Sequence, residues 1–203
     1  MSNASAIALC NRAVARLGGV AISSFSEGSK EAQLCAAFLD ASRDAVLRDH
    51  KWNFATARRV LAQRSDTVAP WSYCYTYPTD CLAAREIYNP ASTTDKISFE
   101  VAMADSGERI IFTNQAAAIL VYTRQITDYA LCDPLFLEAL SWKLATEIAV
   151  PLTMQTALMQ SSATMYRNAL SNAITADANE GEVESVTAAS WLDARLGLSN
   201  RGG

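Results

Sequence analysis

The sequence has 203 residues, of which half are hydrophobic and 19% are charged, a composition that fits one folded domain, or one domain with an appended segment, and excludes a disordered chain. The formal net charge of −4 argues against bulk attraction to nucleic acid, although local patches can still be basic. No window approaches the roughly 20 apolar residues that a membrane span requires, so we expect no integral membrane segment.

The sequence contains one histidine and five cysteines: His50, Cys10, Cys35, Cys74, Cys81 and Cys132. The cysteines form no Cys-x-x-Cys pair, and none stands in a zinc-like spacing with the histidine. We therefore expect reduced thiols, as in a cytoplasmic protein, and neither a metal nor a cofactor.

Helix signals come first along the chain. Apolar residues recur at three- and four-residue steps near the N-terminus, which predicts a helix over residues 3–17 that ends at Gly18-Gly19. Ser29 can cap a second helix, whose apolar stripe continues to about Asp49. We assign this helical hairpin to residues 1–68.

Strand signals then dominate residues 69–129. Aromatic and polar residues alternate before Pro78, and further strands are predicted at residues 83–88 and 118–123, with a hairpin over 97–113 that turns at 105–107. This segment cannot accommodate the crossover helices that parallel strands need. The strands therefore predict one small antiparallel sheet inserted between helices.

Helix signals resume at Asp133-Pro134, where the aspartate can cap a helix and proline suits its first position. Pro151 is expected to end or kink this third helix. A fourth helix should follow over residues 153–178, with an inward stripe that includes Met165 and Leu170. With residues 130–178 assigned to these two helices, the predicted fold class is α+β: a four-helix bundle with an inserted antiparallel sheet and an extended C-terminal tail.

The C-terminal tail, residues 179–203, begins with linker-like composition and ends in an apolar segment. The segment is too short to fold alone, so its large side chains suggest an anchor for a partner. The expected anchor residues are Trp191, Leu192, Arg195, Leu196 and Leu198.

No motif in the sequence points to catalysis. His50 stands near the expected end of the second helix, where a capping role fits, and no nucleophile motif surrounds it. Neither of the common glycine-rich nucleotide-binding motifs occurs. We expect a protein that is not an enzyme, since a small enzyme would have to place His50 or a cysteine in a pocket.

Residues 43–64 contain six cations and two acids, interleaved with Trp52 and Phe54. One interpretation is a solvated face whose two aromatic residues plug the core, wedged where the helical hairpin meets the sheet. The other is contact with an acidic partner surface or with DNA phosphates. The residues that would make such contact are Arg48, Lys51, Arg58 and Arg59. The sequence leaves both interpretations open.

Three stretches carry a resemblance: LRDHKWNFA at residues 47–55, WSYCYTYPTDCL at 71–82 and DPLFLEAL at 133–140. With the order of the helices around them, they make the chain similar to the tail tubular protein A family, the head-to-tail adaptors of short-tailed bacteriophages. The resemblance covers about residues 1–180, and the tail beyond Glu180 matches nothing in that family. Lys51 stands where we expect the family to favour proline, a departure that bears only on where the second helix ends.

The resemblance implies a structural protein of the virion tail that is assembled in the host cytoplasm. Its copies would form a ring, expected to be twelve-fold, between the phage portal protein and a tail nozzle similar to tail tubular protein B. The genome would pass through the ring without specific binding. The alternative is a small cytoplasmic nucleic-acid-binding or interaction module that uses the basic residues between Arg48 and Arg59.

Overall fold

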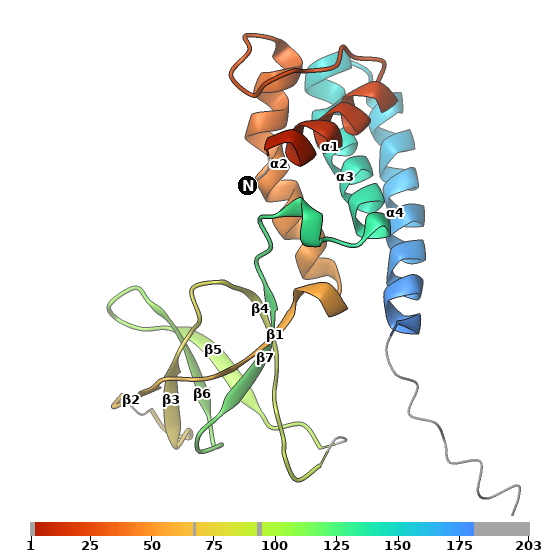
Figure 1. The fold of residues 1–203 in the computed structure, drawn as a ribbon. Helices are drawn as coiled ribbons and strands as arrows, with labels where there is room; N and C mark the ends of the chain where they lie inside the picture. The colour runs from red at the N-terminus through yellow and green to blue at the C-terminus, as the bar shows by residue number, and fades with distance from the viewer. Residues whose placement is uncertain (1–2, 67, 93–94, 181–203) are drawn as a thin grey trace, which may run out of the picture.

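The helices from both ends of the chain lie together at one end of the molecule, and the strands between them in sequence lie at the other (Figure 1). The computed structural model describes residues 3–66, 68–92 and 95–180. Within these residues the fold is α+β, as expected, with four α-helices and two small antiparallel sheets. No described helix is both long enough and apolar enough to cross a membrane.

Local capping signals set the bounds of the first two helices. Helix α1 (Asn3–Arg16) is followed by Gly18 with a φ of +73°, a left-handed conformation that glycine adopts without steric cost. Helix α2 (Lys30–Asp49) begins after Ser29, whose side chain accepts a hydrogen bond from the backbone N–H of Ala32. The expected helical hairpin is therefore confirmed at both of its helices.

Helix α3 (Pro134–Thr153) begins where the Asp133-Pro134 pair predicted it. The Asp133 carboxylate accepts hydrogen bonds from the N–H groups of Leu135 at 2.7 Å and Phe136 at 3.2 Å. Pro151 does not end the helix, which continues to Thr153 and stops at Met154, a residue with a φ of 59°. Thr153 bonds back to the carbonyl of Ala149, and the turn at Met154 leads directly into α4.

Helix α4 (Thr156–Asn179) covers one side of α3. Its expected inward stripe is wrong at Met165, which is 41% exposed. The residues of α4 that are buried are Ser162, Ala173 and Asp177. A helix with so little buried surface leaves a large exposed face on the protein.

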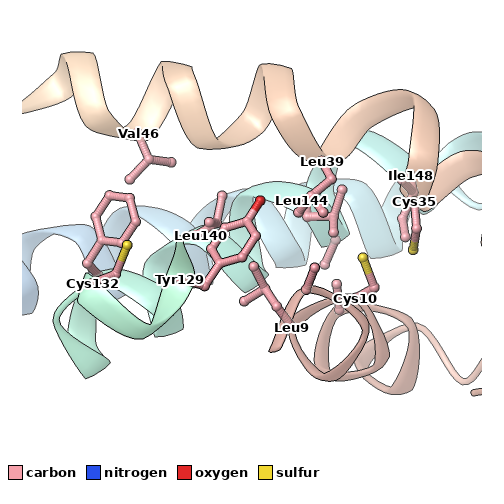
Figure 2. Close-up of a cluster of buried hydrophobic side chains, with 14 of the residues drawn as sticks. Leu9, Cys10, Cys35, Leu39, Val46, Tyr129, Cys132, Leu140, Leu144 and Ile148 are labelled. Carbon is pink, nitrogen blue, oxygen red and sulfur yellow. The ribbon is translucent and has the colours of Figure 1, made fainter. Parts of the chain in front are cut away.

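The helical region has one hydrophobic core, to which all four helices contribute. Figure 2 shows Leu9 and Cys10 of α1 and Leu39 of α2 around Leu140 and Leu144 of α3. Each fully buried leucine contributes about 1.5 to 3 kcal/mol relative to an exposed one. Helix α3 contacts each of the other three helices, so it is the central element of this region.

Seven strands lie in the described residues: β1 (Thr56–Val60), β2 (Gln63–Arg64), β3 (Tyr73–Thr76), β4 (Cys81–Ile87), β5 (Phe99–Met103), β6 (Arg109–Thr113) and β7 (Ile119–Arg124). They form two sheets instead of the single sheet expected from the sequence, with strand orders β1-β7-β4 and β2-β3-β6-β5. Strands β1 and β2 precede residue 69, so strand structure begins inside the segment that we expected to be helical hairpin. Every pair is antiparallel, as predicted.

A second hydrophobic core joins the two sheets. Tyr75 and Ile111 of the four-stranded sheet share a buried cluster with Leu120 and Tyr122 of the three-stranded sheet. The Tyr75 hydroxyl also donates a hydrogen bond to the carbonyl of Gln115 at 2.9 Å, in the connection that leads to β7. The sheets thus have their own core, separate from that of the helices.

Candidate functional sites: the joint and two exposed surfaces

The basic stretch, residues 43–64, contains the joint between the helices and the sheets. Helix α2 ends at Asp49, the short 3-10 helix η1 (Asn53–Ala55) follows, and β1 then enters the three-stranded sheet. Lys51, where the family is expected to favour proline, lies just after the helix end. We call residues 47–56 the joint.

Trp52 fastens the joint to the helical core. Its side chain is 1% exposed, and its ring nitrogen donates a hydrogen bond to the carbonyl of Val46 at 2.9 Å. The rings of Trp52 and Phe54 lie 5.2 Å and 5.1 Å from Phe136 at the start of α3, both at steep interplanar angles that favour aromatic pairs. The two aromatic residues therefore plug the helical core, as the first interpretation expected, and Leu82 of β4 packs against the same cluster.

Arg85 of β4 fastens the joint to the three-stranded sheet. Its guanidinium donates hydrogen bonds to the carbonyls of Arg48 at 2.9 Å and His50 at 2.7 Å, and to the Thr123 hydroxyl at 2.8 Å. Carbonyls at a helix C-terminus have no partner within the helix, so a cation there both satisfies them and complements the helix dipole. Burial, and to a smaller extent the nearby Arg48, lower the pKa of Arg85. An arginine side chain remains charged in proteins. Sequence reasoning missed this residue, because its carbonyl partners are 35 and 37 positions away.

The four expected patch residues each face another group of the same chain. Arg48 donates a hydrogen bond to the carbonyl of Leu82, and the Lys51 ammonium lies 2.9 Å from the Glu86 carboxylate. The Arg58 guanidinium lies 5.4 Å from the ring centre of Tyr88, and that of Arg59 lies 3.5 Å from Asp80. Neighbouring residues on a strand point to opposite faces. The structure thus brings Arg48 and Lys51 together at the joint and places Arg58 and Arg59 on different faces of β1.

His50 ties the end of α4 to the joint. Its Nε2 lies 3.1 Å from the Asp177 carboxylate, which also accepts a hydrogen bond from the Asn53 N–H at 2.9 Å. The side-chain amide of Asn53 in turn donates to the carbonyl of Asp177 at 2.7 Å. The expected capping role of His50 agrees with its position directly after α2.

The cysteines are free, as expected, and all five are buried. Burial raises the pKa of Cys132 to about 12, which keeps this thiol protonated and unreactive at neutral pH. Among the described residues there is no group of three or more His, Cys, Asp or Glu side chains that could hold a metal ion. The expected tail anchors Trp191, Leu192, Arg195, Leu196 and Leu198 lie outside the described residues.

A groove lies between α3 and α4 on the exposed side of the helical region. It has a volume of about 170 Å³ and is lined by Leu135, Glu138, Trp142, Met165, Asn168, Ala169 and Asn172. Leu135 and Met165 are each 41% exposed, so two large apolar side chains of this groove are open to solvent. We call this surface the α3–α4 groove.

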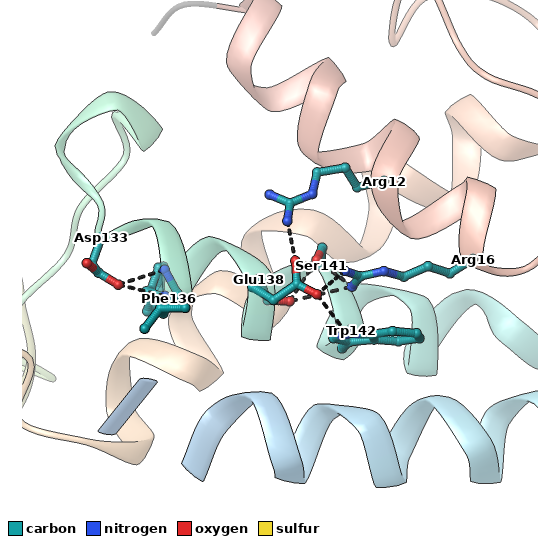
Figure 3. Close-up of polar contacts among 8 residues, drawn as sticks. Arg12, Arg16, Asp133, Phe136, Glu138, Ser141 and Trp142 are labelled. Carbon is teal, nitrogen blue, oxygen red and sulfur yellow. Dashed lines mark hydrogen bonds and ion pairs between the residues drawn. The ribbon is translucent and has the colours of Figure 1, made fainter. Parts of the chain in front are cut away.

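Two arginines of α1 border the α3–α4 groove (Figure 3). Arg12 and Arg16 both pair with the single carboxylate of Glu138, which also accepts a hydrogen bond from the Trp142 ring nitrogen at 3.0 Å. The Arg16 guanidinium lies over the Trp142 ring, 3.7 Å from its centre. Burial lowers the pKa of Arg16, and Glu138 opposes this shift. Two guanidinium groups share one carboxylate, so this border keeps one excess positive charge.

The turn between β5 and β6 is the second exposed surface, which we call the β5–β6 tip (residues 103–109). Gly107 has a φ of +82° and donates a hydrogen bond to the carbonyl of Ala104 at 2.8 Å, and Ala104 donates to Glu108 at 2.8 Å. Met103 is 67% exposed at the start of the tip. The expected hairpin over residues 97–113 is confirmed, including its turn.

Comparison with models of known protein families gave no match for this sequence. A comparison with curated proteins gave no match either.

Proposed function

We propose that this protein is a head-to-tail connector of a short-tailed bacteriophage, related to the tail tubular protein A family. In this role it is a structural adaptor without catalytic activity. Its copies form a twelve-fold ring, a dodecamer, in the virion between the portal protein and a nozzle similar to tail tubular protein B. The genome passes through the lumen during ejection without specific binding.

One observation carries the proposal: the three stretches that resemble the family meet at the joint. Arg48 of the first stretch donates a hydrogen bond to the Leu82 carbonyl of the second. Trp52 of the first packs on Phe136 of the third, with 5.2 Å between ring centres. The three stretches are far apart in sequence but contact one another at one place. This favours a shared architecture over three separate chance similarities.

The architecture also supplies what a ring requires. A closed ring repeats one head-to-tail interface by rotation, so each subunit must carry two different patches. We propose that the four helices act as a four-helix bundle that bears one patch and that the two sheets bear the other. The absence of a catalytic motif from the sequence is compatible with this role.

The C-terminal tail is assigned to portal binding in this proposal. Burial of Trp191 would remove roughly 150 to 250 Å² from water, worth at most about 4 to 6 kcal/mol before ordering costs. One such anchor is weak. Repetition on every subunit makes the attachment of the whole ring strong through multivalency.

The test is the symmetry of the particle that the protein forms with its portal partner, measured by electron microscopy. A twelve-fold ring is the expected result, and a particle without rotational symmetry would contradict the proposal. Removal of residues 185–203 should abolish portal docking and leave the circular-dichroism spectrum of the remainder intact. Substitution of Ser190 by alanine, next to the proposed anchor, serves as the control and should not affect docking.

A further inference from the structure

We infer that the β5–β6 tip of one copy docks into the α3–α4 groove of the next copy. The inference rests on the proposed ring and identifies the two surfaces that would meet in its repeated interface. The occupant of the groove is thus a second copy of this chain, with Met103 as the inserted side chain.

The β5–β6 tip is already ordered in the conformation in which it would bind. Its two backbone hydrogen bonds, between Gly107 and Ala104 and between Ala104 and Glu108, hold the turn in one conformation. A segment that is already ordered loses little entropy when it binds. Met103 is the last residue of β5, directly before this turn, and 67% of its surface is exposed. The neighbouring strand β6 is, by contrast, largely buried.

The α3–α4 groove has the size and the lining for one such side chain. Its volume of about 170 Å³ corresponds to several water molecules at about 30 Å³ each, so it can accept the side chain of one methionine. Leu135, Trp142 and Met165 supply apolar and aromatic contacts, and methionine sulfur packs favourably against aromatic rings. Exposed apolar residues on both surfaces would be covered by the same contact.

The charged groups nearest to the proposed contact are opposite in sign, although the tip also carries Arg109, whose guanidinium lies 3.9 Å from the ring centre of Tyr77. In the tip, Glu108 is paired with Arg64 at 2.8 Å, while Asp105 is exposed and makes no ion pair within the described part of the chain. At the groove, Arg12 and Arg16 share the carboxylate of Glu138 and leave one excess positive charge. Asp105 of one copy can therefore approach Arg12 or Arg16 of the next, which favours this register of docking.

The positions of the two surfaces suit a head-to-tail contact. The tip projects from the sheets on the side of the molecule away from α4 (Figure 1). A copy cannot fill its own groove with a tip on its far side, whereas a neighbour related by rotation can. Each copy then gives one tip and receives another.

The experiment uses two variants of the full chain that each damage one surface. Met103→Lys places a positive charge on the tip, and Met165→Glu places a negative charge in the groove. The matched controls are Val60→Lys, at a residue that is 66% exposed on β1, and Met154→Glu, at a residue that is 79% exposed beyond α3. Circular dichroism and thermal unfolding establish that all four variants fold.

Sedimentation velocity over a range of concentrations should show self-association of the unaltered chain and of both controls. Each surface variant should associate at least about tenfold more weakly, a change of about 1.4 kcal/mol. An equimolar mixture of the two variants should associate more strongly than either variant alone, because the intact tip of one meets the intact groove of the other and the introduced lysine and glutamate attract each other.

Three results would overturn the inference. The first is an unaltered chain that stays monomeric at every concentration, and the second is association of both surface variants at the level of the unaltered chain. The third is loss of association in a chain that ends at Glu180, which would assign the groove to the C-terminal tail. If the protein still forms a twelve-fold particle with the portal protein in any of these cases, the proposed function stands. Only the assignment of this pair of surfaces is then rejected.

Discussion

Arg85 is the residue through which the three-stranded sheet holds the end of helix α2. It donates to three carbonyls at the helix C-terminus, those of Leu47, Arg48 and His50, and to one hydroxyl on β7, so a single side chain bridges three elements. No local pattern in the sequence identifies such a residue, because its neighbours along β4 have no part in its hydrogen bonds. The sequence indicated a joint at this place, but not the side chain that closes it.

Replacement of Arg85 by alanine should lower the free energy of unfolding by about 2 to 3 kcal/mol, because it leaves half-buried carbonyls without their charged donor. Urea denaturation with an unchanged slope measures the loss. Arg85→Lys should recover only part of it, because one ammonium cannot reproduce the planar fork of donors. Arg124→Ala, at an exposed position on β7, is the control and should change stability by less than about 0.5 kcal/mol.

Glu27 organises the loop between α1 and α2. It accepts hydrogen bonds from the Ser29 hydroxyl at 2.6 Å and from the N–H and hydroxyl of Ser23 at 2.9 Å and 2.8 Å. These donors, the Ser29 hydroxyl first, lower the pKa of Glu27 from 4.5 to about 2. The same Ser29 caps α2, so the carboxylate also holds the cap in position.

The lowered pKa of Glu27 predicts a pH dependence of stability. The folded state prefers the charged carboxylate, so the contribution is complete above pH 4.5 and is lost as the pH falls towards about 2. The melting temperature of the unaltered chain should exceed that of Glu27→Gln at pH 6, and the difference should shrink as the pH falls from 4.5 to about 2. A difference that stays constant between pH 6 and pH 2 would contradict the assignment.

The elements of this fold differ in how far the sequence predicts them. The helices were predicted nearly to the residue because their signals are local, as at Ser29 and Asp133, where a side chain caps the helix within three positions. The division of the strands into two sheets was not predicted, because it depends on pairings such as Arg58 with Val121 that join distant parts of the chain. The wrong prediction that Met165 is buried has a similar cause. A hydrophobic residue at helical spacing predicts burial, but tertiary packing decides whether the side chain is covered.

Helix α4 depends on the joint at its C-terminal end. Asp177→Ala removes the acceptor for the Asn53 N–H and the partner of His50, both at a site where Asp177 is 7% exposed. We expect hydrogen exchange of the amides in residues 170–179 to accelerate by about tenfold, equivalent to a loss of about 1.4 kcal/mol in local stability. Ser171→Ala, at an exposed position of the same helix, should leave exchange unchanged. Equal acceleration along the whole of α4 would show that the joint does not act locally.

At the scale of the whole molecule, the cations of the basic stretch bond largely to other groups of the same chain. Arg48 and Lys51 connect the joint to β4, and these contacts could not be predicted because β4 lies more than thirty positions away. Sequence reasoning located the stretch correctly as the transition from helices to sheets. It could not identify the chain's own carbonyls and carboxylates as the partners of the cations.

The double charge reversal Arg58→Glu and Arg59→Glu tests the remaining outward role of the stretch. Both residues are exposed and their contacts are surface contacts, so unfolding free energy should change by less than about 1 kcal/mol. Assembly of the particle should be impaired if an acidic neighbour faces either side of β1. Arg124→Glu, a single charge reversal at an exposed position on the same sheet, provides a control for charge reversal away from β1. Normal assembly of the double variant would exclude β1 from the interface.

DNA affinity separates the connector from the nucleic-acid-binding alternative. For the connector we expect weak or no binding of duplex DNA by the free subunit, measured by fluorescence anisotropy at two salt concentrations. A nucleic-acid-binding module would bind, and its affinity would fall steeply between 50 and 200 mM salt, by about 10³-fold or more for six phosphate contacts. Such a result would favour the alternative.

The hydrogen bonds of Asp177 also have a mechanical consequence. The C-terminal tail leaves the chain after Glu180, only three positions beyond Asp177. Tension applied to the tail would therefore reach the joint almost at once and be shared among α2, α4 and β4, because Asn53, His50 and Arg85 bond there together. We expect a pull on this tail to load several of these bonds in parallel before α4 unwinds from its C-terminal end. In the proposed connector, a subunit tethered by its tail under the pressure of a packaged genome would then resist as one body.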